Sequence, residues 1–180
     1  MTGMNLRHLR RICAARVEAL DLPFPFDVHK LCKSVERARG RMIHLVPRTL
    51  PAGSPSGLCV STNVGDYIFY ESQTSALHQE HIILHEIGHL LCEHRAASVS
   101  REEITELLLP DLDPGIVQRV LGRTCHPVRA EQEAEIIASL ILAKVERQRL
   151  EAVWALPSSV APVVARVERC LRGSLRSAST

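Results

Sequence analysis

Residues 81–94 read HIILHEIGHLLCEH and place four histidines and two glutamates among isoleucines and leucines. A helix through this stretch carries apolar residues on nearly every side, so the sequence predicts that the helix is buried. Unpaired histidines and a carboxylate would cost several kcal/mol in such an environment, and a bound metal ion would offset that cost. The stretch therefore predicts a central helix built around a polar site.

His85, Glu86 and His89 form the pattern H-E-x-x-H within this helix. Because the two histidines are four residues apart, they lie on one face about a turn from each other, and both imidazoles can reach the same ion. Such a site suits hydrolysis with Zn²⁺, in which the metal acidifies a water molecule and the intervening carboxylate takes its proton. A hydrogen-bonded pair of core histidines is the alternative interpretation, and the buried setting favours zinc.

A catalytic zinc site needs a third protein ligand. The metzincin pattern H-E-x-x-H-x-x-G-x-x-H would require glycine and histidine where the chain has Cys92 and Arg95, so that class is excluded. His94 lies one residue early, and we expect it to be solvated near the negative C-terminal end of a helix that ends near Arg95. Cys92 is expected to be a small apolar filler. The third ligand is therefore expected elsewhere in the chain.

A second long helix is predicted from about Pro127 to Arg149, with charges at both ends and an apolar middle. Its first turns contain the run EQEAE, in which Glu131 and Glu135 share a face and Glu133 points nearly opposite. In one interpretation Glu131 binds the metal and Glu135 orients a histidine through its free N–H. In the other the run is a solvated acidic first turn favoured by the helix dipole, and the spacing leaves both open.

The remaining sequence predicts an α+β fold. One amphipathic helix is expected over residues 5–20, and a second follows an Asp27 cap and ends at Gly40. Three short runs rich in β-branched or aromatic residues, separated by turn residues, predict a small, mainly antiparallel sheet. These runs are RMIHLVP (41–47), GLCVST (57–62) and DYIFYES (66–72).

Two short connecting helices are expected between the long ones. Ser100 and Glu103 form a capping box for the first, which Pro110 stops, and the second is expected over residues 113–122. We expect one domain over residues 1–150, followed at 151–180 by a linker, a short helix and a frayed tail.

Composition excludes several classes of function. The net charge of +2 is small, and Lys and Arg are spread along the 180 residues without interleaved aromatics, so no direct contact with nucleic acid is expected. No run of apolar residues is long enough for a membrane span, and the N-terminal residues lack a compact apolar run followed by a small-residue cleavage site, so a cytoplasmic protein is expected. The six cysteines are scattered without any C-x-x-C pair and are expected to be reduced.

The motif HEIGHLL, followed by EQEAEIIA at residues 131–138, resembles the ImmA/IrrE-type metallopeptidases, a family of gluzincin-like zinc enzymes. DYIFYES and HQEHIIL also look like the strand and helix entrance of that family, so the resemblance covers roughly residues 25–145. It implies a compact zincin fold in which a small sheet packs against the two long helices. It also implies that His85, His89 and Glu131 bind Zn²⁺ and that Glu86 is the general base.

The resemblance implies an intracellular zinc endopeptidase with a regulatory role. Family members act by cleaving a repressor or an antitoxin with a helix-turn-helix module, and we expect the target here to be a separate protein of that kind. The peptide is expected to bind as an added strand on a sheet edge, for which DYIFYES is the preferred segment. Tyr67 or Tyr70 could point a hydroxyl at the oxyanion, although aromatic packing is the expected role of each.

Two other functions are compatible with the sequence. The first is a non-catalytic regulator that keeps the zincin fold and binds its partner without cutting it. The second is a structural zinc protein with a closed four-ligand site that uses His94 or His126. The closed site is disfavoured because structural sites prefer cysteine, and no cysteine here has ligand spacing.

Overall fold

The computed structural model describes residues 6–50, 53–94, 97–98, 100–108, 120 and 126–154. The chain divides into two units, Met1–Val145 and Glu146–Thr180. In the second unit the described residues are helical. The predicted linker, short helix and tail after residue 154 lie outside the described residues, as does the helix predicted at 113–122 apart from Val120. The domain boundary at residue 150 stays a prediction.

The two N-terminal helices form where the sequence predicts them. Helix α1 (Leu6–Glu18) buries Leu9, Cys13 and Val17. Helix α2 (Val28–Arg39) begins at an Asp27 cap and ends at Gly40, whose φ of +67° favours glycine. Both predicted ends of α2 are therefore confirmed.

Within the described residues the strands of the sheet are β1 (Ile43–Arg48), β2 (Gly57–Ser61), β3 (Asp66–Glu71) and β4 (Ala97–Ser98). Their order in the sheet is β1-β3-β2-β4. The prediction of a mainly antiparallel sheet is wrong, because only β2 and β3 pair antiparallel, while β1 pairs parallel with β3 and β4 pairs parallel with β2. DYIFYES is also not an edge, because β3 lies between β1 and β2.

A tight turn explains the one antiparallel pair. Thr62 accepts and donates within the turn, with its N–H 2.9 Å from the Gly65 carbonyl oxygen and its hydroxyl oxygen 3.2 Å from the N–H of Gly65. This local bonding joins β2 to β3 as a hairpin. The neighbours β1 and β4 are distant in sequence, so no turn signal reveals how they pair.

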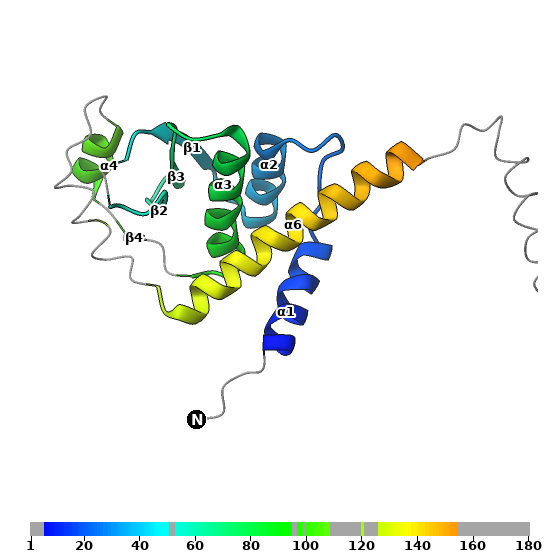
Figure 1. Cartoon of the computed structure of the whole chain (residues 1–180). Coiled ribbons are helices and arrows are strands. Elements are labelled where there is room, and N and C mark those ends of the chain that lie inside the picture. Colours follow the sequence, from blue (N-terminus) through cyan, green and yellow to red (C-terminus); the bar gives the residue numbers. More distant parts are fainter. Residues whose placement is uncertain are drawn as a thin grey trace, which may run out of the picture. The chain divides into compact units, whose positions relative to one another are not determined.

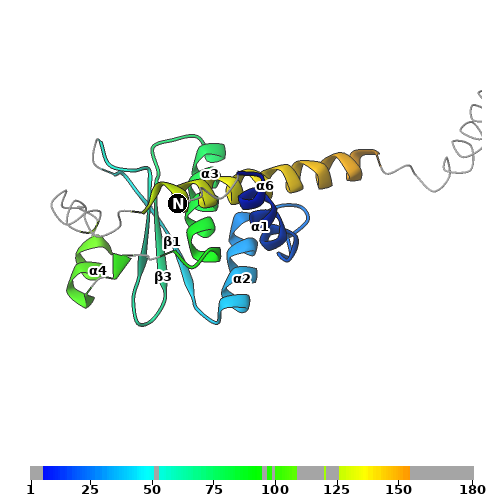
Figure 2. The same ribbon diagram turned by 90° about the horizontal axis from the view of Figure 1, so that it is seen from below.

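The two faces of the sheet carry different layers (Figures 1 and 2). Cys59 and Ile68 belong to a large core with α2 and helix α3 (Ala76–Leu91), and the neighbouring residues Val60 and Phe69 belong to a smaller cluster on the other face. The alternation follows from the two-residue period of a strand. The α+β prediction is therefore confirmed.

Helix α4 (Arg101–Leu108) covers the smaller cluster with Ile104 and Leu107. Its capping box is confirmed: the N–H of Ser100 donates to Glu103 at 2.9 Å, and the N–H of Glu103 donates to the Ser100 hydroxyl at 3.2 Å. None of the helices within the described ranges is long and apolar enough to cross a membrane.

Helix α6 (Val128–Trp154) runs obliquely across α3 (Figure 1). Ile137, Ala138 and Ile141 of α6 are fully buried in the large core. The two helices predicted to carry the polar site are thus packed together, and the crossing is near the start of α6.

Candidate metal centre

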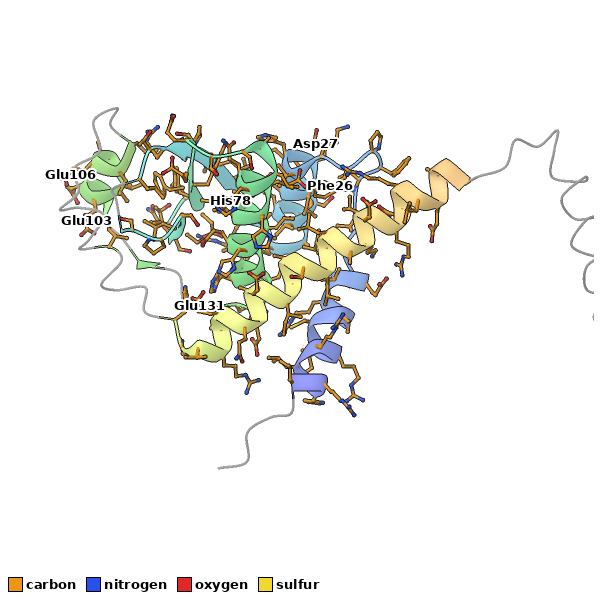
Figure 3. All side chains as sticks on the ribbon, viewed as in Figure 1. Phe26, Asp27, His78, Glu103, Glu106 and Glu131 are labelled. Carbon is orange, nitrogen blue, oxygen red and sulfur yellow. The ribbon has the colours of Figure 1, made fainter. Side chains whose placement is uncertain are left out.

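Two small residues allow α3 and α6 to approach closely. A Cβ atom placed on Gly88 would lie 2.8 Å from both the Cα and the carbonyl oxygen of Ala134, closer than non-bonded atoms approach. Gly88 lies between the two motif histidines in sequence, and Ala134 lies one turn after Glu131. The contact therefore places the first turn of α6 opposite the histidines. Figure 3 shows Glu131 at this end of α6, next to α3.

The atoms of His85, His89 and Glu131 converge on one point. The two Nε2 atoms are 3.1 Å apart, and the Glu131 carboxylate lies 3.2 Å from Nε2 of His85 and 3.6 Å from Nε2 of His89. Ligands about 2.1 Å from a tetrahedral Zn²⁺ are separated by about 3.4 Å. The spacing of the two imidazole nitrogens and the Glu131 carboxylate therefore fits a zinc ion.

The electrostatics of His89 also suit a metal ligand. Its side chain is only 4% exposed, and burial, followed by the nearby His126, His85 and His94, lowers its pKa to about 3. A neutral imidazole offers the lone pair that a metal requires. The site therefore holds His89 in its ligand form at neutral pH.

Glu86 packs against strand β2 and lines the same cavity as the three ligand residues. It is 7% exposed, and burial, together with the negative charge of Glu131, raises its pKa to about 8. The N–H of Cys59 donates to its carboxylate, and Gly57 leaves room for it, since a Cβ there would lie 2.6 Å from Oε1. Glu86 is thus a buried carboxylate with an unusually high proton affinity.

Glu135 lies one turn beyond Glu131 on the same face of α6. Its Oε2 is 3.4 Å from Nδ1 of His85 and 3.4 Å from Nε2 of His81. Since Nε2 of His85 faces Glu131, the Glu135 carboxylate is placed to accept a hydrogen bond from the N–H at Nδ1 of His85. His81 was not expected at the site, although its four-residue spacing from His85 puts both on one face.

A cavity of about 380 Å³ opens beside these groups. His126 contributes to its wall and stacks on His89, with ring centroids 4.1 Å apart and the planes inclined by 21°. Tyr67 stacks on His44 instead, and neither Tyr67 nor Tyr70 lines the cavity. The lining residues are Pro55, Ser56, Gly57, Leu58, Cys59, His78, His81, Ile82, His85, Glu86, His89, His126, Glu131 and Glu135.

The expectations for His94 and the end of α3 are wrong. The helix ends at Leu91, and Glu93 adopts a left-handed φ of +55°. The N–H of His94 then donates to the His89 carbonyl at 3.0 Å and that of Glu93 to Leu90 at 3.2 Å, which is the Schellman arrangement. This turn folds His94 back toward His89 and away from solvent.

Glu133 makes a contact that the sequence does not predict. His94 and Glu133 have side chains only 11% and 12% exposed, and Nε2 of His94 lies 2.9 Å from Oε2 of Glu133. Burial raises the pKa of Glu133, but hydrogen bonds from His94 and Arg129 outweigh this effect and lower it. No periodicity in the sequence signals this contact, because it depends on the left-handed turn at Glu93.

Cys92, His94 and Glu133 also bring potential ligand atoms together. However, Nε of Arg129 lies 3.0 Å from Glu133, and Nη1 of Arg16 lies 3.7 Å from the Cys92 sulfur. Burial raises the pKa of the Cys92 thiol to about 11, so the sulfur stays protonated at neutral pH. Two arginines and a neutral thiol do not suit a cation, and this group is therefore a hydrogen-bonded cluster.

Comparison with known proteins gave no match to a family model, to a curated protein or to a solved structure.

Proposed function

We propose that the protein is a zinc-dependent endopeptidase with an ImmA/IrrE-like zincin fold. The observation that carries the proposal is the convergence of His85, His89 and Glu131 at 3.1–3.6 Å beside a buried Glu86 and an open cavity. Three ligands facing a cavity leave a coordination position for water or substrate. A closed four-ligand site with His94 is disfavoured, because both ring nitrogens of His94 are engaged by His89 and Glu133.

Each residue has a separate role in this proposal. Zn²⁺ held by the three ligands would supply Lewis acidity, which lowers the pKa of a water molecule and polarises a peptide carbonyl. Glu86 then accepts the proton of the attacking water and delivers it to the leaving amine. Its pKa of about 8, caused by burial and by Glu131, lies near neutrality and suits both transfers. Glu135 holds the ring of His85.

Strand β2 offers a place for an extended peptide. Gly57, Leu58 and Cys59 line the cavity, whereas β4 pairs with β2 only through Val60 and Ser61. Within the part of the chain that the structure describes, the outer backbone edge of residues 57–59 has no partner strand. A peptide added along this edge would lie next to the ligand atoms and Glu86. The edge is thus β2, in place of β3.

The proposed target is a separate helix-turn-helix repressor or antitoxin, by resemblance to the ImmA/IrrE-type enzymes. The second candidate function is a regulator that binds such a partner without cutting it. The burial of Glu86 favours the enzyme. A metal site used only for binding has no need of a carboxylate whose ionisation is made costly by burial.

The decisive experiment compares wild-type protein with Glu86→Gln. The amide keeps the size of the side chain but cannot accept the proton, so zinc content and fold should persist while turnover is lost. Each protein is expressed with a helix-turn-helix regulator if one is encoded beside its gene, and is otherwise incubated with a cell lysate, and fragments are sought by mass spectrometry. A fragment that forms only with wild type supports the endopeptidase. Equal binding and equal regulation by both, without any cleavage, would establish the non-catalytic regulator.

A further inference from the structure

A chain of polar contacts runs from the surface to the candidate metal centre. The Glu133 carboxylate lies 2.9 Å from Nε2 of His94, Nδ1 of His94 lies 3.0 Å from Nδ1 of His89, and Nε2 of His89 faces Glu131 and His85. Arg129 anchors the outer end through Oε1 of Glu133 at 3.0 Å. His94 and Glu133, which have no role in the proposed reaction, thus connect α6 to the metal ligand His89.

The chemistry of these groups determines which atom donates and which accepts in each of these hydrogen bonds. An ionised carboxylate can only accept, so Nε2 of His94 must carry a proton. In neutral His94 the other nitrogen, Nδ1, is then an acceptor, and Nδ1 of His89 must donate to it. The proton of His89 is thereby held on Nδ1, and Nε2 is left with its lone pair toward Glu131 and His85.

We propose that His94 and Glu133 are a positioning pair that fixes the tautomer and ring orientation of His89 for metal binding. This inference rests on the metal site of the proposed function. A carboxylate that acts through an intervening imidazole replaces the direct carboxylate or carbonyl partner that metal-binding histidines commonly have. The equivalent partner of His85 is Glu135, which contacts Nδ1 directly at 3.4 Å.

The backbone supports a specific role for His94. Glu93 is the one described non-glycine residue with a positive φ, and a left-handed conformation is unfavourable for an L-residue because its Cβ crowds the following carbonyl oxygen. The bonds of the Schellman turn and the contact of His94 with His89 offset that cost. The strained turn brings the imidazole to a position that a continuing helix would not reach.

The first test measures zinc affinity by competition with a chromophoric chelator. Glu133→Ala should weaken zinc binding about 10- to 100-fold, because the ring of His89 loses its fixed tautomer. Glu133→Gln should recover most of the affinity, since its amide oxygen still accepts from His94 and Arg129, whose side chain is 59% exposed, can turn away. Glu133→Met fills similar space without an acceptor and should resemble Glu133→Ala. The control is Gln132→Ala, an exposed neighbour on α6.

The second test follows the tautomer itself in metal-free protein. Long-range ¹H–¹⁵N spectra of ¹⁵N-histidine-labelled wild type should show His89 protonated on Nδ1, and Glu133→Ala or Glu133→Met should give a mixture of tautomers. A purely structural role would let Glu133→Met restore the affinity. That result, or an unchanged affinity and tautomer in Glu133→Ala, would overturn the positioning pair.

These readouts do not depend on peptidase activity. If wild type binds zinc and shows the Nδ1–H tautomer but never cleaves a partner, the endopeptidase fails and the positioning pair stands. If wild type does not bind zinc, the proposed metal site fails, and a positioning role toward the metal fails with it. If zinc binds and partners are cut while the Glu133 variants behave like Gln132→Ala, only the positioning pair fails.

Discussion

Helices α3 and α6 hold two histidine–glutamate clusters that use the same chemical groups for different ends. In the first, which we call the open cluster, His85 and His89 face Glu131, and Glu86 lies beside them. The side chain of Glu131 is 48% exposed at the wall of an open cavity. In the second, which we call the closed cluster, the side chains of His94 and Glu133 are only 11% and 12% exposed, and Arg129 contacts Glu133. Access and neighbouring charge, more than residue type, therefore decide whether such a cluster suits a metal.

The two clusters also affect the stability of the folded state differently. The open cluster places a carboxylate, Glu86, where its charge is unfavourable, whereas the closed cluster stabilises the charge of Glu133 by hydrogen bonds. The first is a site prepared for a ligand, and the second is satisfied by the protein itself.

The largest expected effect comes from removing a ligand of the open cluster. His89→Ala or Glu131→Ala should abolish zinc retention through gel filtration, measured by elemental analysis, because two ligands cannot hold the ion. Wild type should retain about one zinc per chain. His94→Ala should still contain zinc when assayed with excess metal. Complete loss in His94→Ala would make the closed cluster part of the metal site and would end the contrast between the two.

The next largest effect is a pH dependence of opposite sign in the two clusters. In chelator-treated protein the folded pKa of Glu86 is about 8, against 4.5 when unfolded, so the folded state holds the proton more tightly. As pH rises from about 5 to about 8, wild type should lose stability relative to Glu86→Gln, on the order of 1 kcal/mol per pH unit. Urea unfolding at a series of pH values measures this difference.

Glu133 should behave in the reverse sense. Its folded pKa lies below the unfolded value of 4.5, so its stabilisation is complete above that value and is lost as pH falls through the folded pKa. Wild type should therefore lose its advantage over Glu133→Gln on acidification. Parallel pH profiles for the Glu86 and Glu133 variants would contradict the electrostatic contrast between the clusters.

Gly88→Ala tests the helix contact that builds the open cluster. Alanine normally stabilises a helix interior by about 1 kcal/mol relative to glycine, but here its Cβ would collide with the backbone of Ala134. We expect destabilisation of about 1–3 kcal/mol and weaker zinc binding as Glu131 moves away. Unfolding curves and zinc titration measure both. A more stable variant with full zinc affinity would show that the helices need no such close approach.

The smallest effect is expected at the turn that builds the closed cluster. Glu93→Gly relieves the left-handed strain at φ +55° and should stabilise the protein by up to about 1 kcal/mol, without changing zinc affinity. Thermal unfolding with and without zinc checks this expectation. Lower zinc affinity in this variant would mean that the Glu93 side chain contributes to the site.

Local features of the sequence determined the ends of several helices. Asp27, Ser75 and Ser100 cap the helices that follow them, since a side-chain oxygen satisfies free N–H groups within three residues. The helical period likewise placed His85 and His89 on one face of α3. These interactions join residues that are close in sequence, so the sequence alone is enough to predict them.

Tertiary structure decided the rest. The pairing of β1 and β4, the end of α3 at Leu91 and the contact between His94 and Glu133 join segments that are far apart or turn on one unusual φ. The role of Glu131 could not be predicted from sequence spacing either, because the spacing is compatible with a metal ligand and with a solvated glutamate. The close contact of Gly88 with Ala134 brings Glu131 to the histidines. Such contacts depend on the distance between packed helices, and the side chains of both helices at the contact determine that distance.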